Sequence, residues 1–399
     1  MENPKRRCFM KLAWRRNLIY PCMLSIWILL RKGITFLLDK FFNFSTNIFF
    51  TLLMFAGELF AGLILYFYQK SFLRKNKTNN DKKNALIFSE GEMKMPDSKI
   101  KIYFLIFVIG FFDFIEYILL TNYIPKFPFS SGSLDLRSGG IMTIISALFF
   151  YYLLKLPILR HQFFSLCNIA ICLTATIILE YIFQDINYFI SYWDLSLKIL
   201  LIITEQFFNA LLDCIENYCV NYNNYNCFKV LSLEGLFGSI ITGFYLCFER
   251  SYLIQFKEIF SEHSGEMLAL FIFLLFIYIV LCGLKNAYRV ITNKIYSPMT
   301  KSLTDYFLNP LYLVLHYIEG DFISGGKQSI IYFSINFVLT IITNLFGCVF
   351  NEIIILFFCD FERETHNQIS FRSTITYRND LSEINDNTEE EEDNLDELN

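Results

Sequence analysis

Apolar residues in this chain gather in long runs that short polar stretches separate. A helix that spans a membrane needs roughly 20 mostly apolar residues, because the hydrocarbon layer is about 30 Å thick. Runs of this kind predict ten membrane-spanning helices: Leu18–Leu38, Asn47–Tyr68, Ile102–Tyr123, Leu134–Leu154, Leu159–Phe183, Leu197–Cys219, Lys229–Phe248, Met267–Lys285, Thr300–Ile318 and Ser329–Phe358. The third, fifth, eighth and tenth runs have the longest cores, which we interpret as free of charge. The predicted fold class is an all-α integral membrane protein.

Composition argues against a soluble globular protein. Apolar residues make up 54% of the 399 residues, and phenylalanine alone contributes 46. A single core could not bury that much apolar surface. The 11 cysteines and 4 histidines are scattered, without CxxC or HExxH spacing. We therefore expect no disulfide framework, no metal site and no cofactor.

Basic residues set the predicted orientation in the membrane. The N-terminal segment, residues 1–17, is basic, and so are the polar loop 69–101 and the segments around Lys155 and Lys294. With an even number of spans, all of these segments fall on one side. The positive-inside rule then places both termini in the cytosol. Residues 359–399 are predicted to form a disordered acidic tail on the same side.

A similar polar interruption recurs five spans apart. Gly57-Glu58 lies near the middle of the second span, and Glu234-Gly235 lies in the seventh. Two five-helix halves of opposite orientation, residues 18–183 and 197–358, would produce such an echo. In transporters built this way, the substrate site lies between the repeats. The sequence therefore predicts two inverted five-helix repeats.

The polar residues of the sixth and seventh spans resemble the pattern of a known family. Gln206, Glu216 ten residues later and the block Glu234–Gly238 resemble the F-type branch of solute carrier family 35. This branch belongs to the drug/metabolite transporter superfamily and is related to the nucleotide-sugar transporters. Weaker matches are Gly57-Glu58, Leu136-Arg137, and Lys294 with Asp305. The resemblance covers about Leu18 to Phe358 and implies a ten-helix carrier with the drug/metabolite transporter fold.

Two departures from the family pattern leave the substrate open. Leu308 stands where the branch commonly has an arginine, and Lys285 and Arg289 stand where it tends to have small or apolar residues. All three lie on the eighth and ninth spans, which line the cavity in this superfamily. The parasite drug-resistance transporters of the same superfamily resemble the layout as well. They carry paired cysteines in the loop before the eighth span, and residues 249–266 contain none.

Polar side chains inside apolar segments are the candidate functional residues, because a charge at hydrocarbon depth costs at least about 2.5 kcal/mol. The predicted substrate-binding or cavity residues are Glu58, Gln206, Glu216, Glu234 and Asn286. Glu234 could bind substrate or carry a coupling proton. The alternative is a structural hydrogen bond to a neighbouring helix, with Gly235 and Gly238 allowing close backbone contact. Interhelical hydrogen bonding is likewise the alternative for the other residues.

Charges near the ends of the third, fourth, eighth and ninth spans suggest two gates. The predicted gate charges are Glu116, Arg137, Lys285, Arg289 and Asp305. Each half then has an acid and a base on its third and fourth helices, at opposite faces of the membrane. Our hypothesis is that these pairs latch the outer and inner gates alternately, since breaking a partly buried ion pair is costly. Charged side chains that anchor helix ends are the alternative.

The predicted function is a multi-pass secondary transporter that moves a small polar or anionic organic metabolite by alternating access. Enzyme signatures and an ATP-hydrolysing domain are missing from the sequence, so a gradient or exchange would drive the transport. The expected partners are the substrate and the lipid bilayer, without nucleic acid, and the expected location is an internal membrane such as Golgi, lysosome or vacuole. A homodimer is left open. Two alternatives are a non-transporting scaffold whose acidic tail recruits a cytosolic partner, and a vacuolar exporter of the drug-resistance type.

Overall fold

The structure is a computed structural model of the 399-residue chain. The residues it describes are 10–12, 19–44, 48–76, 99–124, 138–155, 158–183, 192–223, 225–249, 251–295 and 326–356, with residues 304, 306, 308, 310 and 311. Among them, seven helices are long and apolar enough to cross a membrane. The protein is thus a helical, multi-pass membrane protein.

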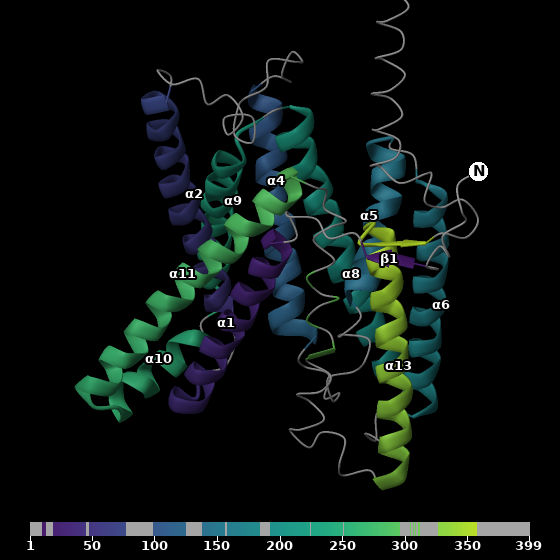
Figure 1. Ribbon diagram of the computed structural model, residues 1–399. Helices are drawn as coiled ribbons and strands as arrows, with labels where there is room; N and C mark the ends of the chain where they lie inside the picture. The colour runs from purple at the N-terminus through teal and green to yellow at the C-terminus, as the bar shows by residue number, and fades with distance from the viewer. Residues whose placement is uncertain are drawn as a thin grey trace, which may run out of the picture.

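The helices follow the apolar runs of the sequence (Figure 1). In chain order they are α1 (Ile19–Phe42), α2 (Ile48–Asn76), α4 (Lys99–Ile118), α5 (Ser138–Leu153), α6 (Arg160–Ile182), α8 (Tyr192–Asn217), α9 (Cys227–Leu246), α10 (Ser251–Glu262), α11 (Gly265–Ile295) and α13 (Gly326–Phe350). Five-residue π-helical turns, Leu119–Tyr123 and Tyr218–Tyr222, continue α4 and α8. Each expected span except Thr300–Ile318 coincides with one of these helices, and most of that span lies outside the described residues.

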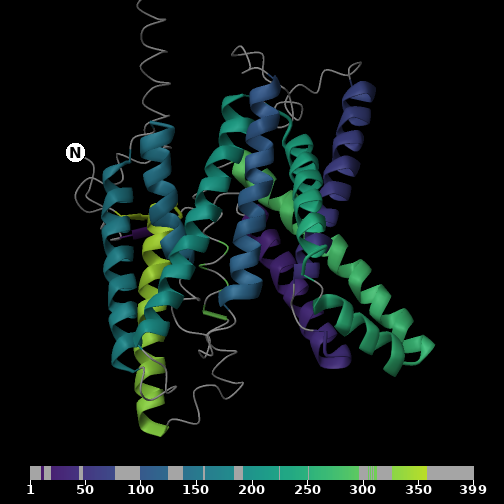
Figure 2. The ribbon, with the colours of Figure 1, turned by 180° about the vertical axis from the view of Figure 1, so that it is seen from behind.

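Helices from the two sequence halves pack against each other. Helix α2 packs on α9 and α11, and α11 also packs on α1. On the other side of the molecule, α5 packs on α6 and α8, and α13 packs on α6. Helices α4 and α8 join the two groups, because α4 contacts both α8 and α9 (Figures 1 and 2). The two expected halves are therefore interleaved in space.

Charged side chains lie inside the bundle, and large apolar side chains lie on its surface. Glu58, Asp213, Glu216 and Glu234 are fully buried. Apolar side chains that are more than half exposed include Ile64, Phe104, Ile171, Phe244 and Phe276. Water would favour the opposite distribution, whereas lipid favours this one. The charged interior agrees with a membrane protein.

The tenth span ends earlier than the sequence predicts. Helix α13 stops at Phe350, and Glu352 adopts a positive φ of 57°. The Ile353 N–H donates to the Cys348 carbonyl at 2.9 Å and the Glu352 N–H donates to the Val349 carbonyl at 3.0 Å, which is the bonding of a Schellman helix end. The chain then forms strand β2 (Ile354–Leu356), antiparallel to β1 (Met10–Leu12). The apolar run to Phe358 is therefore not one helix.

Other boundaries are also corrected. Helix α11 continues ten residues beyond the predicted end at Lys285, so Arg289 lies within a helix rather than at its end. Residues 249–266 contain a helix, α10, where only a loop was expected. Helix α2 extends to Asn76 and α4 begins at Lys99, so both ends of the predicted loop 69–101 are helical. A run of apolar residues marks the lipid-embedded part of a helix, not the ends of its hydrogen bonding.

Candidate functional site

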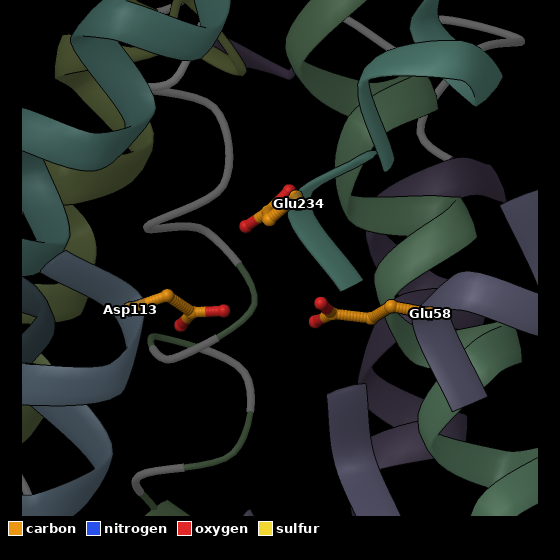
Figure 3. A group of neighbouring side chains, drawn as sticks. All are labelled: Glu58, Asp113 and Glu234. Carbon is orange, nitrogen blue, oxygen red and sulfur yellow. The ribbon is translucent and has the colours of Figure 1, made fainter. Parts of the chain in front are cut away.

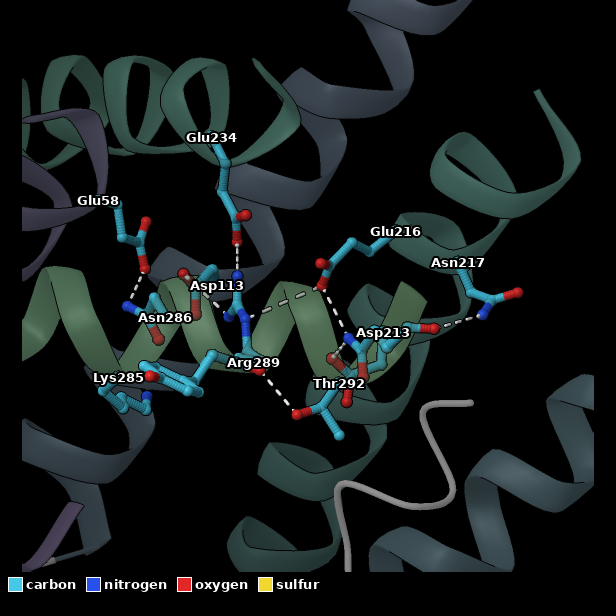
Figure 4. Close-up of polar contacts among 12 residues, drawn as sticks. Glu58, Asp113, Asp213, Glu216, Asn217, Glu234, Lys285, Asn286, Arg289 and Thr292 are labelled. Atoms are coloured by element: carbon cyan, nitrogen blue, oxygen red, sulfur yellow. Dashed lines mark hydrogen bonds and ion pairs between the residues drawn. The ribbon is translucent and has the colours of Figure 1, made fainter. Parts of the chain in front are cut away.

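Arg289 of α11 lies at the centre of a buried group of carboxylates (Figure 4). Its side chain is 3% exposed. Arg289 Nη2 is 2.6 Å from Glu234 Oε1 on α9, which makes this the tightest contact of the group. Arg289 Nε is 3.9 Å from Glu216 Oε2 on α8, and Nη1 is 4.0 Å from Asp113 Oδ2 on α4. One guanidinium thus links four helices.

Asn293 extends this group one helical turn further along α11. Its amide nitrogen donates to Glu216 Oε2 at 3.0 Å and lies 3.2 Å from Asp213 Oδ1, both on α8. The Asn293 carbonyl in turn accepts hydrogen bonds from Asn217 and Asn221, each at 3.3 Å. All of these contacts join α11 to the C-terminal end of α8 or to the π-helical turn that continues it. Arg289 and Asn293 lie four residues apart, so they share one face of the helix.

Glu58 enters the same region from α2. Its Oε1 accepts a hydrogen bond from Asn286 Nδ2 on α11, and the Glu58 side chain is fully buried. Glycines allow this approach: a Cβ on Gly283 of α11 would lie 2.7 Å from the Gly57 carbonyl oxygen. A Cβ on Gly235 of α9 would meet the α2 backbone beside Glu58. The helices therefore meet where Cβ atoms are missing.

Three buried carboxylates gather near one another (Figure 3). Glu58 of α2, Asp113 of α4 and Glu234 of α9 point toward a common space. Each offers an oxygen that lies within 4.8 Å of the others, and all three side chains are buried. Ionised carboxylates this close repel one another strongly in a medium of low dielectric constant. This acidic triad (Glu58, Asp113 and Glu234) therefore requires compensating positive charge.

Tyr117 of α4 lies near the acidic group and holds two basic side chains. Its hydroxyl accepts a hydrogen bond from Arg31 Nη1 of α1 at 3.2 Å and from Lys285 Nζ of α11 at 3.1 Å. Lys285 Nζ also lies 5.7 Å from the centre of the Tyr117 ring, within cation–π range. Helix α1 is thus tied to the other helices of the site through a phenol group.

Local features of α9 fix the depth of Glu234. Asn226 precedes the helix, and its side-chain oxygen accepts hydrogen bonds from the N–H groups of Phe228 at 3.0 Å and Lys229 at 3.2 Å. This N-cap starts α9 at Cys227, two residues before the predicted start. Glu234 then lies two turns into the helix, on the face that carries Gly235 and Gly238 toward α2.

The structure brings several of the predicted cavity residues together. Glu58, Glu216, Glu234 and Asn286 all belong to the network around Arg289. Gln206 is different: it is buried on α8, and its amide donates to the carboxylate of its neighbour Glu205. Interhelical bonding, which was the alternative for these residues, is present at Glu58, Glu216 and Glu234.

The structure describes some of the predicted gate charges and not others. Arg137 and Asp305 lie outside the described residues, so both latch pairs stay predictions. Glu116 is half-buried on α4, next to Tyr117. Arg289, expected near the end of a span, instead pairs with Glu234 deep inside the bundle. Its depth follows from the length of α11, which continues past it for nearly two turns.

Sequence reasoning missed part of the site. Asp113, Asp213 and Asn293 belong to the network, and Arg31 and Tyr117 adjoin it. Asp113 carried a usable signal, since it stands inside the apolar run Ile102–Tyr123 that was interpreted as free of charge. That interpretation is wrong. Asn293 gave no such signal, because it lies beyond the predicted end of its span.

No protein-family model matches the chain, and no curated protein matches it. The resemblance to solute carrier family 35 therefore stays a prediction from the residues quoted above. The site itself supplies an acidic, buried group with one guanidinium and several amides. Such a group can bind a cation, exchange protons, or hold helices in one of two arrangements.

Proposed function

We propose that this protein is a secondary transporter of the drug/metabolite type, which moves a small polar or anionic organic metabolite by alternating access. One observation carries the proposal: buried charges from α2, α4, α8, α9 and α11 converge around Arg289 within the membrane-spanning part of the bundle. Glu58, Glu216, Glu234 and Arg289 all lie inside candidate membrane spans. The sequence contains no recognisable ATP-hydrolysing motif, so in this proposal a solute gradient or an exchanged solute drives the transport cycle.

A purely structural role accounts poorly for so many buried charges. Charged side chains within a membrane are rare and usually mark ion or substrate pathways. A buried ion pair is also often no more stabilising than apolar side chains of similar volume. Five carboxylates that share one arginine and two asparagines therefore serve a purpose other than stability. Transport is the function that most often needs such groups.

The packing of the helices supports two inverted repeats. If each helix is exchanged with the one five spans later, the contact of α2 with α11 becomes the contact of α9 with α4. The contact of α1 with α11 becomes that of α8 with α4, while α2–α9 and α6–α13 map onto themselves. All of these contacts are present. A pattern that survives this exchange is expected for a pseudo-two-fold axis between two halves.

Glycine contacts repeat the same relation. Gly57 of α2 lies against Gly283 of α11, where a Cβ on Gly57 would be 2.9 Å from the Gly283 nitrogen. On the exchanged pair, a Cβ on Gly110 of α4 would lie 3.2 Å from the Glu234 carbonyl oxygen and 3.3 Å from the Gly238 nitrogen of α9. The paired motifs Gly57-Glu58 and Glu234-Gly235 thus lie at corresponding helix crossings. This agreement supports the internal echo seen in the sequence.

Tyr306 supports a tenth membrane-spanning element. It belongs to the predicted ninth span and is buried, with its hydroxyl 2.7 Å from Thr143 Oγ1 of α5. Its ring also lies against Gly347 of α13. In addition, α11 ends at the end of the molecule opposite to the start of α13 (Figures 1 and 2). The chain between them has to connect those two ends.

Counterflow in proteoliposomes tests the proposal. Purified protein is first screened by thermal shift against nucleotides, nucleotide sugars, amino acids and organic cations, and each stabilising compound is then tested for uptake. Saturable counterflow that Glu234→Gln reduces, and that Glu180→Gln leaves unchanged, is the expected result. Glu180 of α6 is a matched control, because its carboxylate accepts a hydrogen bond at 2.7 Å from the Tyr332 hydroxyl of α13, away from Arg289. If no compound is transported, while deletion of residues 359–399 still produces a cellular phenotype, the protein is a scaffold.

A further inference from the structure

We infer that Glu58, Asp113 and Glu234 form a binding site for a divalent metal cation. The sequence predicted no metal site, because its histidines and cysteines are scattered. Carboxylates from three different helices leave no such spacing in a sequence. This site is made of the same buried carboxylates that support the proposed transport function. The protein could bind a cation there whether or not it is a transporter.

The geometry of the acidic triad suits a hard cation. Divalent ions such as Mg²⁺, Mn²⁺ and Ca²⁺ bind carboxylate oxygens at about 2.0–2.6 Å. Two oxygens on opposite sides of such an ion are therefore about 4–5 Å apart. The three carboxylates offer oxygens that all lie within 4.8 Å of one another, so one ion can reach all of them. Side chains that supply only oxygen favour these ions over zinc or copper.

Two buried oxygens of the triad point independently to a ligand. Among the described residues, Glu58 Oε2 and Glu234 Oε2 are buried without a hydrogen-bond partner. Their companion oxygens are held by Asn286 and by Arg289, so each carboxylate is fixed with its second oxygen still available. Figure 3 shows both carboxylates directed toward the space that they share with Asp113. A buried carboxylate oxygen without a partner is costly, and a bound cation would remove that cost.

Charge balance indicates a divalent ion. When all groups are ionised, the three carboxylates carry three negative charges, and the Arg289 guanidinium, which Glu216 also contacts, offsets at most one of them. This surplus would repel an anionic metabolite, whereas a divalent ion would neutralise it. Arg289 and Asn286 orient two of the three ligands, as groups around metal ligands commonly do. The substrate and the cation would then be carried by the same set of helices.

Metal binding to the full-length protein tests this inference. The protein is reconstituted in nanodiscs of phosphatidylcholine, which has no net charge, and Mn²⁺ is titrated while free Mn²⁺ is followed by electron paramagnetic resonance. We expect one Mn²⁺ whose affinity falls roughly tenfold or more in Glu58→Gln and in Asp113→Asn. Mg²⁺ and Ca²⁺ should displace it. Glu180→Gln is the control, and the acidic tail contributes equally in every variant.

A second measurement keeps the result independent of folding and of transport. Ca²⁺ should raise the melting temperature of the wild type and of Glu180→Gln, but not that of Glu58→Gln or Asp113→Asn, each checked for a single elution peak. Equal Mn²⁺ binding by all variants would overturn the site. A melting temperature that depends on pH and not on metal would overturn it too, assigning the positive charge to protons. Metal binding without counterflow would support the metal site and contradict only the proposed transport function.

Discussion

Arg289 meets three carboxylates from three other helices, and its contact with Glu234 is the closest. We expect Arg289→Gln to lower the free energy of unfolding by about 3–5 kcal/mol, because it leaves buried carboxylates without their counter-charge. The double variant Arg289→Gln/Glu234→Gln should recover part of this loss, since one of the orphaned charges is removed. Thermal unfolding in detergent measures both. Lys257→Gln, an exposed change on α10, is the neutral control.

A double variant no more stable than Arg289→Gln alone would contradict this account. The Glu234 contact would then contribute little, and the more distant Glu216 and Asp113 would hold the guanidinium. The two pairings are distinguishable, because Arg289→Gln/Glu216→Gln would in that case show the recovery instead.

Asn293 makes a separate contribution to the same face of α11. We expect Asn293→Ala to cost about 1–3 kcal/mol, since its amide serves the buried carboxylates of Asp213 and Glu216. Asn168→Ala is a matched control, because the Asn168 amide donates to the Phe164 carbonyl one turn away on its own helix. Melting temperatures of the two variants, measured in the same detergent, give the comparison. An equal fall in melting temperature in both variants would mean that the contacts of Asn293 with α8 stabilise the protein no more than a hydrogen bond within one helix does.

The sequence allowed most of the acidic residues to be predicted, but not which residues they pair with. A charge within an apolar run conflicts with lipid wherever it occurs, so Glu58, Glu216 and Glu234 could be identified one at a time. The same rule identifies Asp113 once its run is read without assuming a charge-free core. The pairing of Glu234 with Arg289 depends on how α9 and α11 cross, and hydropathy carries no information about that crossing.

Helix α11 crosses α2 where two glycines face each other. A Cβ on Gly283 would lie 2.7 Å from the Gly57 carbonyl oxygen and 2.9 Å from Ala61 Cβ. We expect Gly283→Ala to lower the melting temperature, because overpacking costs about 1–3 kcal/mol and exceeds the helix-propensity gain of about 1 kcal/mol. Gly243→Ala on α9, with nothing within 4 Å of its Cβ, should keep or raise it. Fluorescence-detected size exclusion after heating measures both.

A rise in melting temperature for Gly283→Ala would mean that α2 and α11 can separate without loss. The crossing would then be loose, and Glu58 would not be held against Asn286 by close helix packing.

Element positions were predicted best where charged residues stand only near the two ends of an apolar run. The run Leu159–Phe183 became α6, Arg160–Ile182, within one residue at each end. Helix α11 shows the opposite case, because Asn286, Arg289 and Asn293 turn toward the interior and end the apolar run without ending the helix. The end of α13 could not be foreseen either, since Glu352 occupies a left-handed conformation in which glycine is usual.

Across the whole molecule, the segments that flank the first and last helices lie together. Strand β1 pairs with β2 through Met10 and Leu356, Lys11 and Ile355, and Leu12 and Ile354. Strand β1, which precedes α1 in the chain, therefore lies beside β2, which follows α13 (Figure 1). An even number of crossings has this consequence and an odd number does not. The tenth crossing that we propose would fall between α11 and α13, where Tyr306 is buried.

Protease protection therefore distinguishes ten crossings from nine. Epitope tags are placed at both ends of the chain, and sealed vesicles that expose the cytosolic face are treated with protease. We expect both tags to be removed together, because an even number of spans and the positive-inside rule put both ends on that face. Removal of one tag and protection of the other would mean an odd number of spans. The pairing of β1 with β2, and with it the exchange of helices between two inverted halves, would then be wrong.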